Sequence, residues 1–153
     1  MITDRVVLED IRSSWNTVRI SQEMIQTNLN VAFAFGGAQS HNFKNLAYSL
    51  ILIFAFSVIE DALRQLEDQG VFSAKNRQLG TLMHASKSAL PWVAFQFVDE
   101  GRERRNDVAH KREYLERADC WKYIDAIENE LIAWRILLGK AQATYTITVT
   151  PTS

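Results

Sequence analysis

The sequence is poor in residues that break helices and in residues that cross-link a chain. Its 153 residues include only 6 glycines and 2 prolines. Turns must therefore be few, which favours long helices over a fold of many short strands. The single cysteine, Cys120, cannot form an internal disulfide, and no CxxC pair of the zinc-binding kind occurs. We therefore expect no disulfide framework, no metal site, no cofactor and no cysteine nucleophile.

The sequence also lacks an excess of charge and a long hydrophobic run. The formal net charge is −1, which argues against a protein that coats nucleic acid and means that any such contact should be local. The longest apolar run covers only residues 46–59, whereas a bilayer span takes roughly 20 residues. The N-terminus is interrupted by charges and does not resemble a signal peptide. We therefore expect a cytoplasmic protein with no membrane contact.

Hydrophobic side chains, which make up 47% of the chain, recur at helical intervals over about residues 4–32, 42–67 and 121–138. The first half of the second segment is apolar nearly all round, so this helix should lie at the centre of the structure. Residues 76–86 are typical of a shorter helix, and Pro91 suits the first turn of another. The predicted fold class is all-α, an up-and-down bundle of four to five helices.

The predicted helix boundaries depend on capping residues and glycines. Asn42 can cap the second helix, and Gly70 and Gly139 can end the second and the last. Gly101 can bend or interrupt the fourth helix. Three tryptophans at helical positions are predicted to be core or interface residues: Trp15, Trp121 and Trp134.

The last residues differ in character from the rest. Residues 144–150 alternate as a β-strand does, and a lone strand must either pair with a second copy of the chain or be disordered. The domain organisation predicted is one helical domain over residues 1–142, followed by an extended tail over residues 143–153.

The most informative motif is Arg105-Asn106-Asp107-Val108-Ala109-His110. It resembles the Arg-x4–6-His motif of the HEPN superfamily. Asn106 matches the polar residue that usually follows the arginine, and Val108-Ala109-His110 matches the usual ending of an apolar residue, a small residue and histidine. That family consists of all-helical domains, many of them metal-independent ribonucleases in toxin–antitoxin or phage-defence systems. The resemblance implies an endoribonuclease that leaves a 2′,3′-cyclic phosphate and a 5′-hydroxyl.

These residue types suit that chemistry. His110 can take the proton from the ribose 2′-hydroxyl, because an imidazole exchanges protons near neutral pH. The guanidinium of Arg105 can meet the negative charge that grows on the phosphate. Asn106 can orient the imidazole or hold a phosphate oxygen. Four further cations are predicted to contact RNA: Arg102, Arg104, Lys111 and Arg112. The alternative is that they form only a solvated basic patch.

Three residues outside the motif have competing interpretations. Some HEPN nucleases add an upstream acidic residue, which suggests Glu60, although an ordinary helix-surface carboxylate is the commoner case. Some HEPN toxins carry a tyrosine, modified by a nucleotidyltransferase antitoxin, two residues after the histidine. Tyr114 follows His110 by four residues, so we predict a packing residue. His84 is predicted to be a surface residue of the short third helix.

The spacing of the motif has a geometric consequence. Residues five apart on a regular helix lie roughly 140° around it, so Arg105 and His110 should not share a face. Either the helix is distorted there, or two copies build a composite site across a two-fold axis. HEPN nucleases resemble the second case, so we predict a homodimer, with an antitoxin or nucleotidyltransferase as a further partner.

Two other functions compete with the nuclease. A non-catalytic HEPN-like module would bind nucleotides or a protein in the same cleft without cutting. A helical interaction module would bury Arg105 and His110 in a local network. The nuclease requires both groups to be exposed in one cleft.

Overall fold

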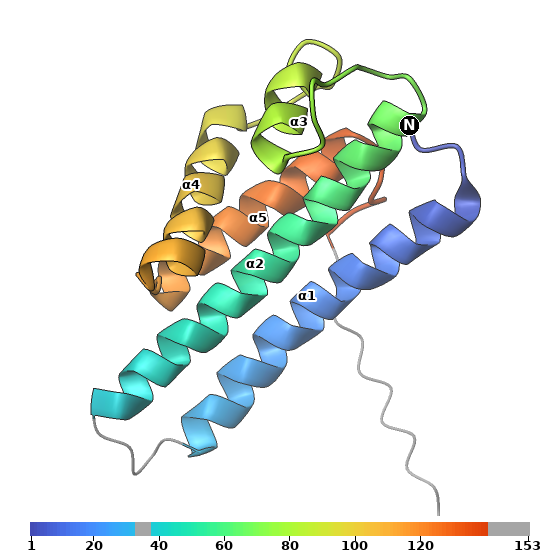
Figure 1. The fold of residues 1–153 in the computed structure, drawn as a ribbon. Helices are drawn as coiled ribbons and strands as arrows, with labels where there is room; N and C mark the ends of the chain where they lie inside the picture. The colour runs from blue at the N-terminus through green and yellow to red at the C-terminus, as the bar shows by residue number, and fades with distance from the viewer. Residues whose placement is uncertain (33–37, 141–153) are drawn as a thin grey trace, which may run out of the picture.

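The computed structural model describes the backbone of residues 1–32 and 38–140 and the side chains of residues 1–26 and 43–140 (Figure 1). Within these ranges the chain forms helices and no strands: α1 Arg5–Ala32, α2 Ala38–Asp68, α3 Leu79–Ser86, α4 Phe95–Lys111 and α5 Arg117–Ala133. The prediction of an all-α bundle is confirmed. The strand predicted over residues 144–150 lies outside the described residues.

The central element is α2, which contacts each of the other four helices. Figure 1 shows the four long helices alternating in direction along the chain, with α1 and α2 antiparallel and α4 and α5 antiparallel. The short helix α3 belongs to the connection between α2 and α4, at one end of the bundle. The prediction that the second helix is central is therefore confirmed.

The hydrophobic core follows from this central position. The largest fully buried side chains come mainly from α2 and α5, with Trp15 from α1: Leu52, Phe56, Ile59, Leu63, Leu66, Ile124, Ile127 and Leu131. Trp134 is also buried, and Trp121 packs edge-on against Tyr48 at the margin of the core. Residues Phe43–Asp68 are long and apolar enough to span a membrane by composition, and 56% of the apolar window is buried inside the bundle.

The ends of α2 show one wrong prediction and one confirmed. The helix begins at Ala38, four residues before the predicted cap at Asn42. At its other end Gly70 has a φ of 74°, the amide of Gly70 donates to the carbonyl of Glu67, and that of Val71 donates to Leu66. This pair of hydrogen bonds is a Schellman motif, which requires a left-handed residue. Gly70 therefore ends the helix, as predicted.

The predicted starts of the third and fourth helices are wrong. Asn76 accepts a hydrogen bond from the Gln78 amide at 3.0 Å, which forms a local turn, and α3 begins only at Leu79. Pro91 is not in a helix, because α4 begins at Phe95. The buried carboxylate of Glu130 accepts hydrogen bonds from the amides of residues 93 and 94, at 2.7 and 2.6 Å, and so fixes the chain just before α4. Burial raises the pKa of Glu130, while these two amides oppose that shift.

Two other predicted boundaries differ from the structure. The last helix ends at Ala133 instead of reaching Gly139, and Leu138 is 90% exposed rather than a core residue. Gly101 does not interrupt α4, which continues through it. A Cβ atom at Gly101 would lie 2.6 Å from Cδ1 of Tyr123 and 3.1 Å from Cζ of Phe56, so the glycine allows α4 to approach these two rings.

Candidate functional site

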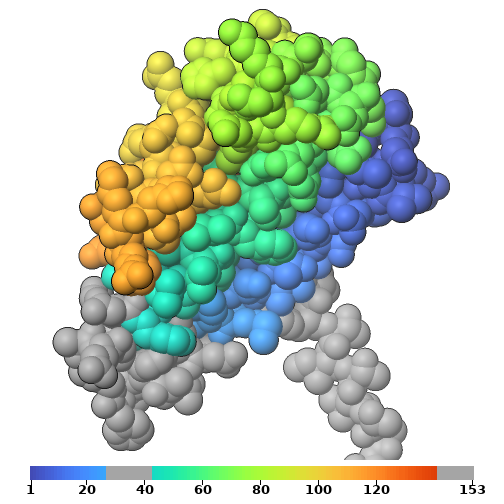
Figure 2. Space-filling view, viewed as in Figure 1, coloured from blue at the N-terminus to red at the C-terminus, as the bar shows by residue number. Residues whose placement is uncertain are grey.

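The surface of the bundle is hollowed between α3, α4 and the connection over residues 69–78. This cleft has a volume of about 940 Å³. Figure 2 shows the surfaces of α3 and α4 side by side on the face that this view presents. The polar side chains that border the cleft include those of Lys75, His84, Arg102, Arg105, Asn106 and His110.

The cleft brings together the three central residues of the predicted site. Arg105, Asn106 and His110 all border it in a single chain. The helix α4 runs without interruption from Phe95 to Lys111, so no distortion is needed. Arg105 and His110 lie at the two edges of the helix face that borders the cleft, and Asn106 lies between them. The Oδ1 atom of Asn106 accepts a hydrogen bond from Nη1 of Arg105 at 3.1 Å, so Asn106 orients the guanidinium.

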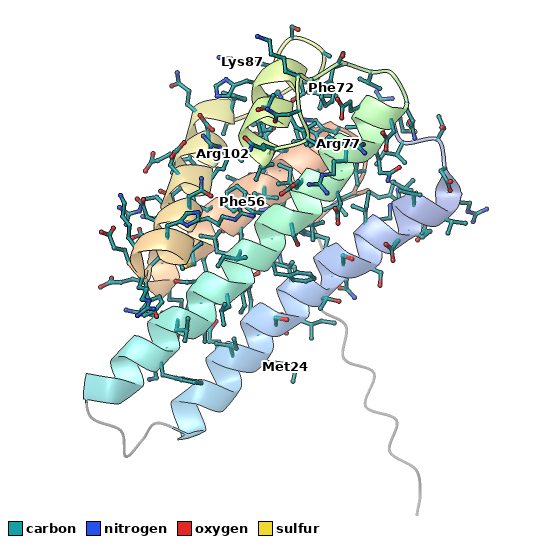
Figure 3. All side chains as sticks on the ribbon, in the orientation of Figure 1. Met24, Phe56, Phe72, Arg77, Lys87 and Arg102 are labelled. Carbon is teal, nitrogen blue, oxygen red and sulfur yellow. The ribbon has the colours of Figure 1, made fainter. Side chains whose placement is uncertain are left out.

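Arg102 is the one predicted RNA-binding cation that borders the cleft. Its Nε atom donates to Oδ1 of Asp99 at 2.7 Å, and its guanidinium also pairs with Glu103. Burial lowers the pKa of Arg102, but these two carboxylates outweigh that effect and the net pKa is raised. A Cβ atom at Gly80 would lie 3.2 Å from the guanidinium carbon, so Arg102 reaches across the cleft to α3 (Figure 3).

The other three predicted cations do not border the cleft. Arg104 is exposed on the side of α4 that faces Tyr123, where its charge opposes the rise of the Tyr123 pKa to about 12 that burial and Glu100 cause. Lys111 pairs with Asp107 at 2.9 Å. Arg112 ends α4 with a φ of 58° and is exposed. Of the arginines and lysines in residues 102–112, only Arg102 and Arg105 therefore border the cleft.

Two residues outside the motif also lie apart from the cleft. Glu60 pairs with Arg64 one turn along α2 and does not border the cleft, so the structure does not bring it to Arg105 or His110. Tyr114 lies in the connection between α4 and α5 and is 40% exposed. The prediction that Tyr114 is a packing residue is therefore wrong.

Sequence reasoning missed two ionisable residues of the cleft, His84 and Lys75. His84 is an exposed residue of α3, as predicted, but it borders the cleft. Its Nε2 atom lies 3.5 Å from Oδ2 of Asp99. Lys75 comes from the non-helical connection before α3. No local pattern marks either residue, because only the packing of α3 against α4 gathers them.

The charge of the cleft is strongly one-sided. Its lining contains three permanent cations, Lys75, Arg102 and Arg105, and the imidazoles of His84 and His110, but no carboxylate. Within the described part of the chain, no acidic side chain pairs with Lys75 or Arg105. Because Asp99 and Glu103 balance the charge of Arg102, the local excess of positive charge rests on Lys75 and Arg105, and it suits an anionic ligand.

The exposure of Arg105 and His110 also bears on the alternative functions. His110 is exposed and Arg105 is half-buried at the cleft. The burial of both groups that the interaction-module alternative requires is therefore not found. Among the described residues, no three histidine, cysteine, aspartate or glutamate side chains gather as a metal site requires.

Comparisons with known proteins add no family to these observations. No family model, no curated protein sequence and no solved structure matches the chain.

Proposed function

We propose that the protein is a metal-independent endoribonuclease of HEPN type, with its active site in the cleft between α3 and α4. The observation that carries the proposal is the gathering of Arg105, Asn106 and His110 around one cleft, where no described carboxylate pairs with Arg105 or Lys75. The motif alone is a short pattern, but its residues border one solvent-accessible cleft whose positive charge suits a phosphate.

The proposed reaction is an internal attack within RNA. His110 takes the proton of a ribose 2′-hydroxyl, whose oxygen forms a bond to the adjacent phosphorus. Arg105, held by Asn106, stabilises the negative charge on the non-bridging phosphate oxygens. The bond from phosphorus to the 5′-oxygen then breaks, and the protonated His110 returns its proton to the leaving oxygen. The products are a 2′,3′-cyclic phosphate and a 5′-hydroxyl.

The test compares two neighbouring arginines. Purified protein is incubated with a labelled RNA of mixed sequence in the presence of EDTA, beside His110→Ala, Arg105→Ala and Arg104→Ala variants. We expect both cleft variants to cut at least about 10²-fold more slowly, because each removes a group that acts on the reacting atoms. Arg104→Ala removes the same charge one residue away but outside the cleft, so it should cut at nearly the wild-type rate.

Two other results would contradict the nuclease proposal. Equal cutting by wild-type protein and both cleft variants would show a contaminating nuclease and reject the proposal. RNA that binds but is never cut, with binding lost in Arg105→Ala, would support the non-catalytic nucleotide-binding module instead. Circular dichroism of each variant shows that the helices remain intact.

We also propose a homodimer in the cytoplasm, and a toxin–antitoxin or phage-defence setting with an antitoxin or nucleotidyltransferase as partner, on the basis of the HEPN resemblance. Light scattering at micromolar concentration should give twice the 17.5 kDa of one chain. Mixing Arg105→Ala with His110→Ala protein tests whether the site is composite. Recovery of cutting in the mixture would mean that the two residues act from different protomers, and no recovery would mean that they act within one.

A further inference from the structure

Another hollow of the surface lies between α1 and α2, and it is apolar where the cleft is charged. It has a volume of about 360 Å³. Figure 1 shows the two helices lying side by side. None of the side chains that border this hollow is charged, and only that of Ser21 is polar. We call it the apolar groove, and its main bordering residues are Ser21, Met24, Ile25, Ala47, Leu50 and Phe54.

The large side chains of the apolar groove are unusually exposed for hydrophobic residues. Met24 of α1 is 50% exposed, and Leu50 and Phe54 of α2 are 54% and 38% exposed. Leu50 and Phe54 lie one turn apart on α2, so they form a ridge beside the groove. The bundle buries only 56% of the apolar window of this helix. One side of α2 is therefore apolar and uncovered.

The uncovered apolar area has the size of the centre of a protein interface. A fully exposed large side chain has a surface of about 200 Å², so Met24, Leu50 and Phe54 together leave about 300 Å² uncovered. A standard interface buries about 800 Å² on each partner, with an apolar centre and a polar rim. The groove supplies such a centre, and the polar residues around it on α1 and α2 can form the rim.

The chemistry of the groove selects among its possible occupants. A surface that binds nucleic acid or anionic lipid includes lysine or arginine, and no cation borders the groove. A small ligand is usually buried over most of its surface, whereas Met24 and Leu50 are half exposed. A second copy of the chain fits best. Across a two-fold axis each copy offers both an uncharged ridge and an uncharged groove, and helices pack by inserting ridges into grooves.

We propose that two copies of the chain dimerise through the apolar groove, with the ridge of Leu50 and Phe54 of each protomer packed in the groove of its partner. This inference names the interface of the homodimer included in the proposed function, and it rests on that homodimer and not on the nuclease activity. The groove and the cleft have no bordering residue in common. Substitutions in the groove therefore leave the residues of the proposed active site unchanged.

The test measures the mass of the protein by light scattering at micromolar concentration, without RNA. The wild type should have twice the 17.5 kDa of one chain. Leu50→Lys should have the mass of one chain, because it places a charge in the apolar interface once in each protomer and weakens the dimer by at least about 10²-fold.

Two matched variants separate the interface from other effects of the substitution. Leu50→Met keeps an apolar side chain of similar volume, so it should remain dimeric. Leu138→Lys adds the same charge at a position that is 90% exposed and lies outside the groove, so it should also remain dimeric. Circular dichroism monitors the helices of each variant, and Phe54→Lys replaces Leu50→Lys if the latter does not fold.

The outcomes distinguish the failure of this inference from that of the nuclease proposal, because the mass is measured without RNA. A wild-type protein with the mass of one chain rejects the dimer. If that monomer binds phosphatidylcholine vesicles and Leu50→Lys does not, the groove is a lipid-binding surface instead. A dimer that persists in both Leu50→Lys and Phe54→Lys rejects the apolar groove as the interface, because the two copies then meet through another face.

Discussion

Gly101 determines how closely α4 can pack against the rest of the bundle. Its missing side chain leaves room for the ring of Tyr123 from α5 and of Phe56 from α2. The face of α4 that carries Arg102, Arg105 and His110 is therefore held at a fixed distance from α2 and α5. A glycine that looks like a break in the sequence is instead a packing residue.

We expect Gly101→Ala to destabilise the protein by up to about 2 kcal/mol. Alanine gains about 1 kcal/mol over glycine in helix propensity, but its methyl group would lie 2.6 Å from Cδ1 of Tyr123, and such overpacking forces side chains or backbone to move. Urea unfolding followed by circular dichroism measures the change.

Gly139→Ala is the control for Gly101→Ala, because a Cβ atom at Gly139 meets nothing within 4 Å. Its free energy of unfolding should change by no more than about 0.5 kcal/mol. A Gly101→Ala variant that is more stable than the wild type would contradict the proposed packing role.

At the scale of elements, the C-terminal end of α5 lacks the glycine that usually follows a helix end of this kind. Arg135 has a φ of 59°; its amide donates to the carbonyl of Ile132, and that of Ile136 donates to Leu131. These are the two hydrogen bonds of a Schellman motif, with an arginine at the left-handed position. The side chain of Arg135 is exposed, and no described residue forms an ion pair with it.

Replacing Arg135 by glycine should therefore stabilise the protein by about 1 kcal/mol. A side chain at the left-handed position costs roughly this much, and glycine removes the cost while keeping both hydrogen bonds. Thermal unfolding measures the effect. Lys122→Gly, at an exposed position within α5, should instead lose about 1 kcal/mol, because glycine is unfavourable inside a helix. Destabilisation by both variants would show that the side chain of Arg135 contributes to the fold.

The helix ends also show what the sequence could predict. Apolar periodicity identified the long helices and the central place of α2, because these depend on burial along one segment. The ends depend on contacts from elsewhere: Glu130 of α5 holds the residues before α4, and Arg135 takes a position usually left to glycine. In the same way Arg105, Asn106 and His110 were found together because they share one helix. Lys75 and His84 were missed because tertiary packing brings them to the cleft.

At the scale of the whole molecule, the polar residues of the cleft are separate from the core that stabilises the fold. The core is centred on α2 and extends to buried apolar residues of all five helices, whereas the ionisable residues of the cleft lie at its surface on α3, α4 and the connection before α3. Most of its polar residues are exposed or half-buried, so substitutions there should affect binding and cutting with little loss of stability. This separation makes the proposed function testable with folded variants.

The distribution of charge predicts how binding to RNA should depend on salt. With a net charge of −1, the protein has no general attraction for phosphate, and binding should depend on the two cations of the cleft whose charge no carboxylate balances, Lys75 and Arg105. Each phosphate contact on single-stranded RNA contributes about −0.7 to the slope of log affinity against log salt, so we expect a slope no steeper than about −1.4. Fluorescence anisotropy with the His110→Ala variant measures binding without cutting.

Lys75→Ala, made in the His110→Ala variant, should reduce that slope by about 0.7, because it removes one unpaired cation from the cleft. Lys111→Ala is the control: Lys111 lies outside the cleft and its charge is balanced by Asp107, so the slope should not change. Equal effects of the two substitutions would mean that RNA also contacts the exposed end of α4. The affinity would then come from cations inside and outside the cleft alike, and the proposal that the cleft is the RNA-binding site would be rejected.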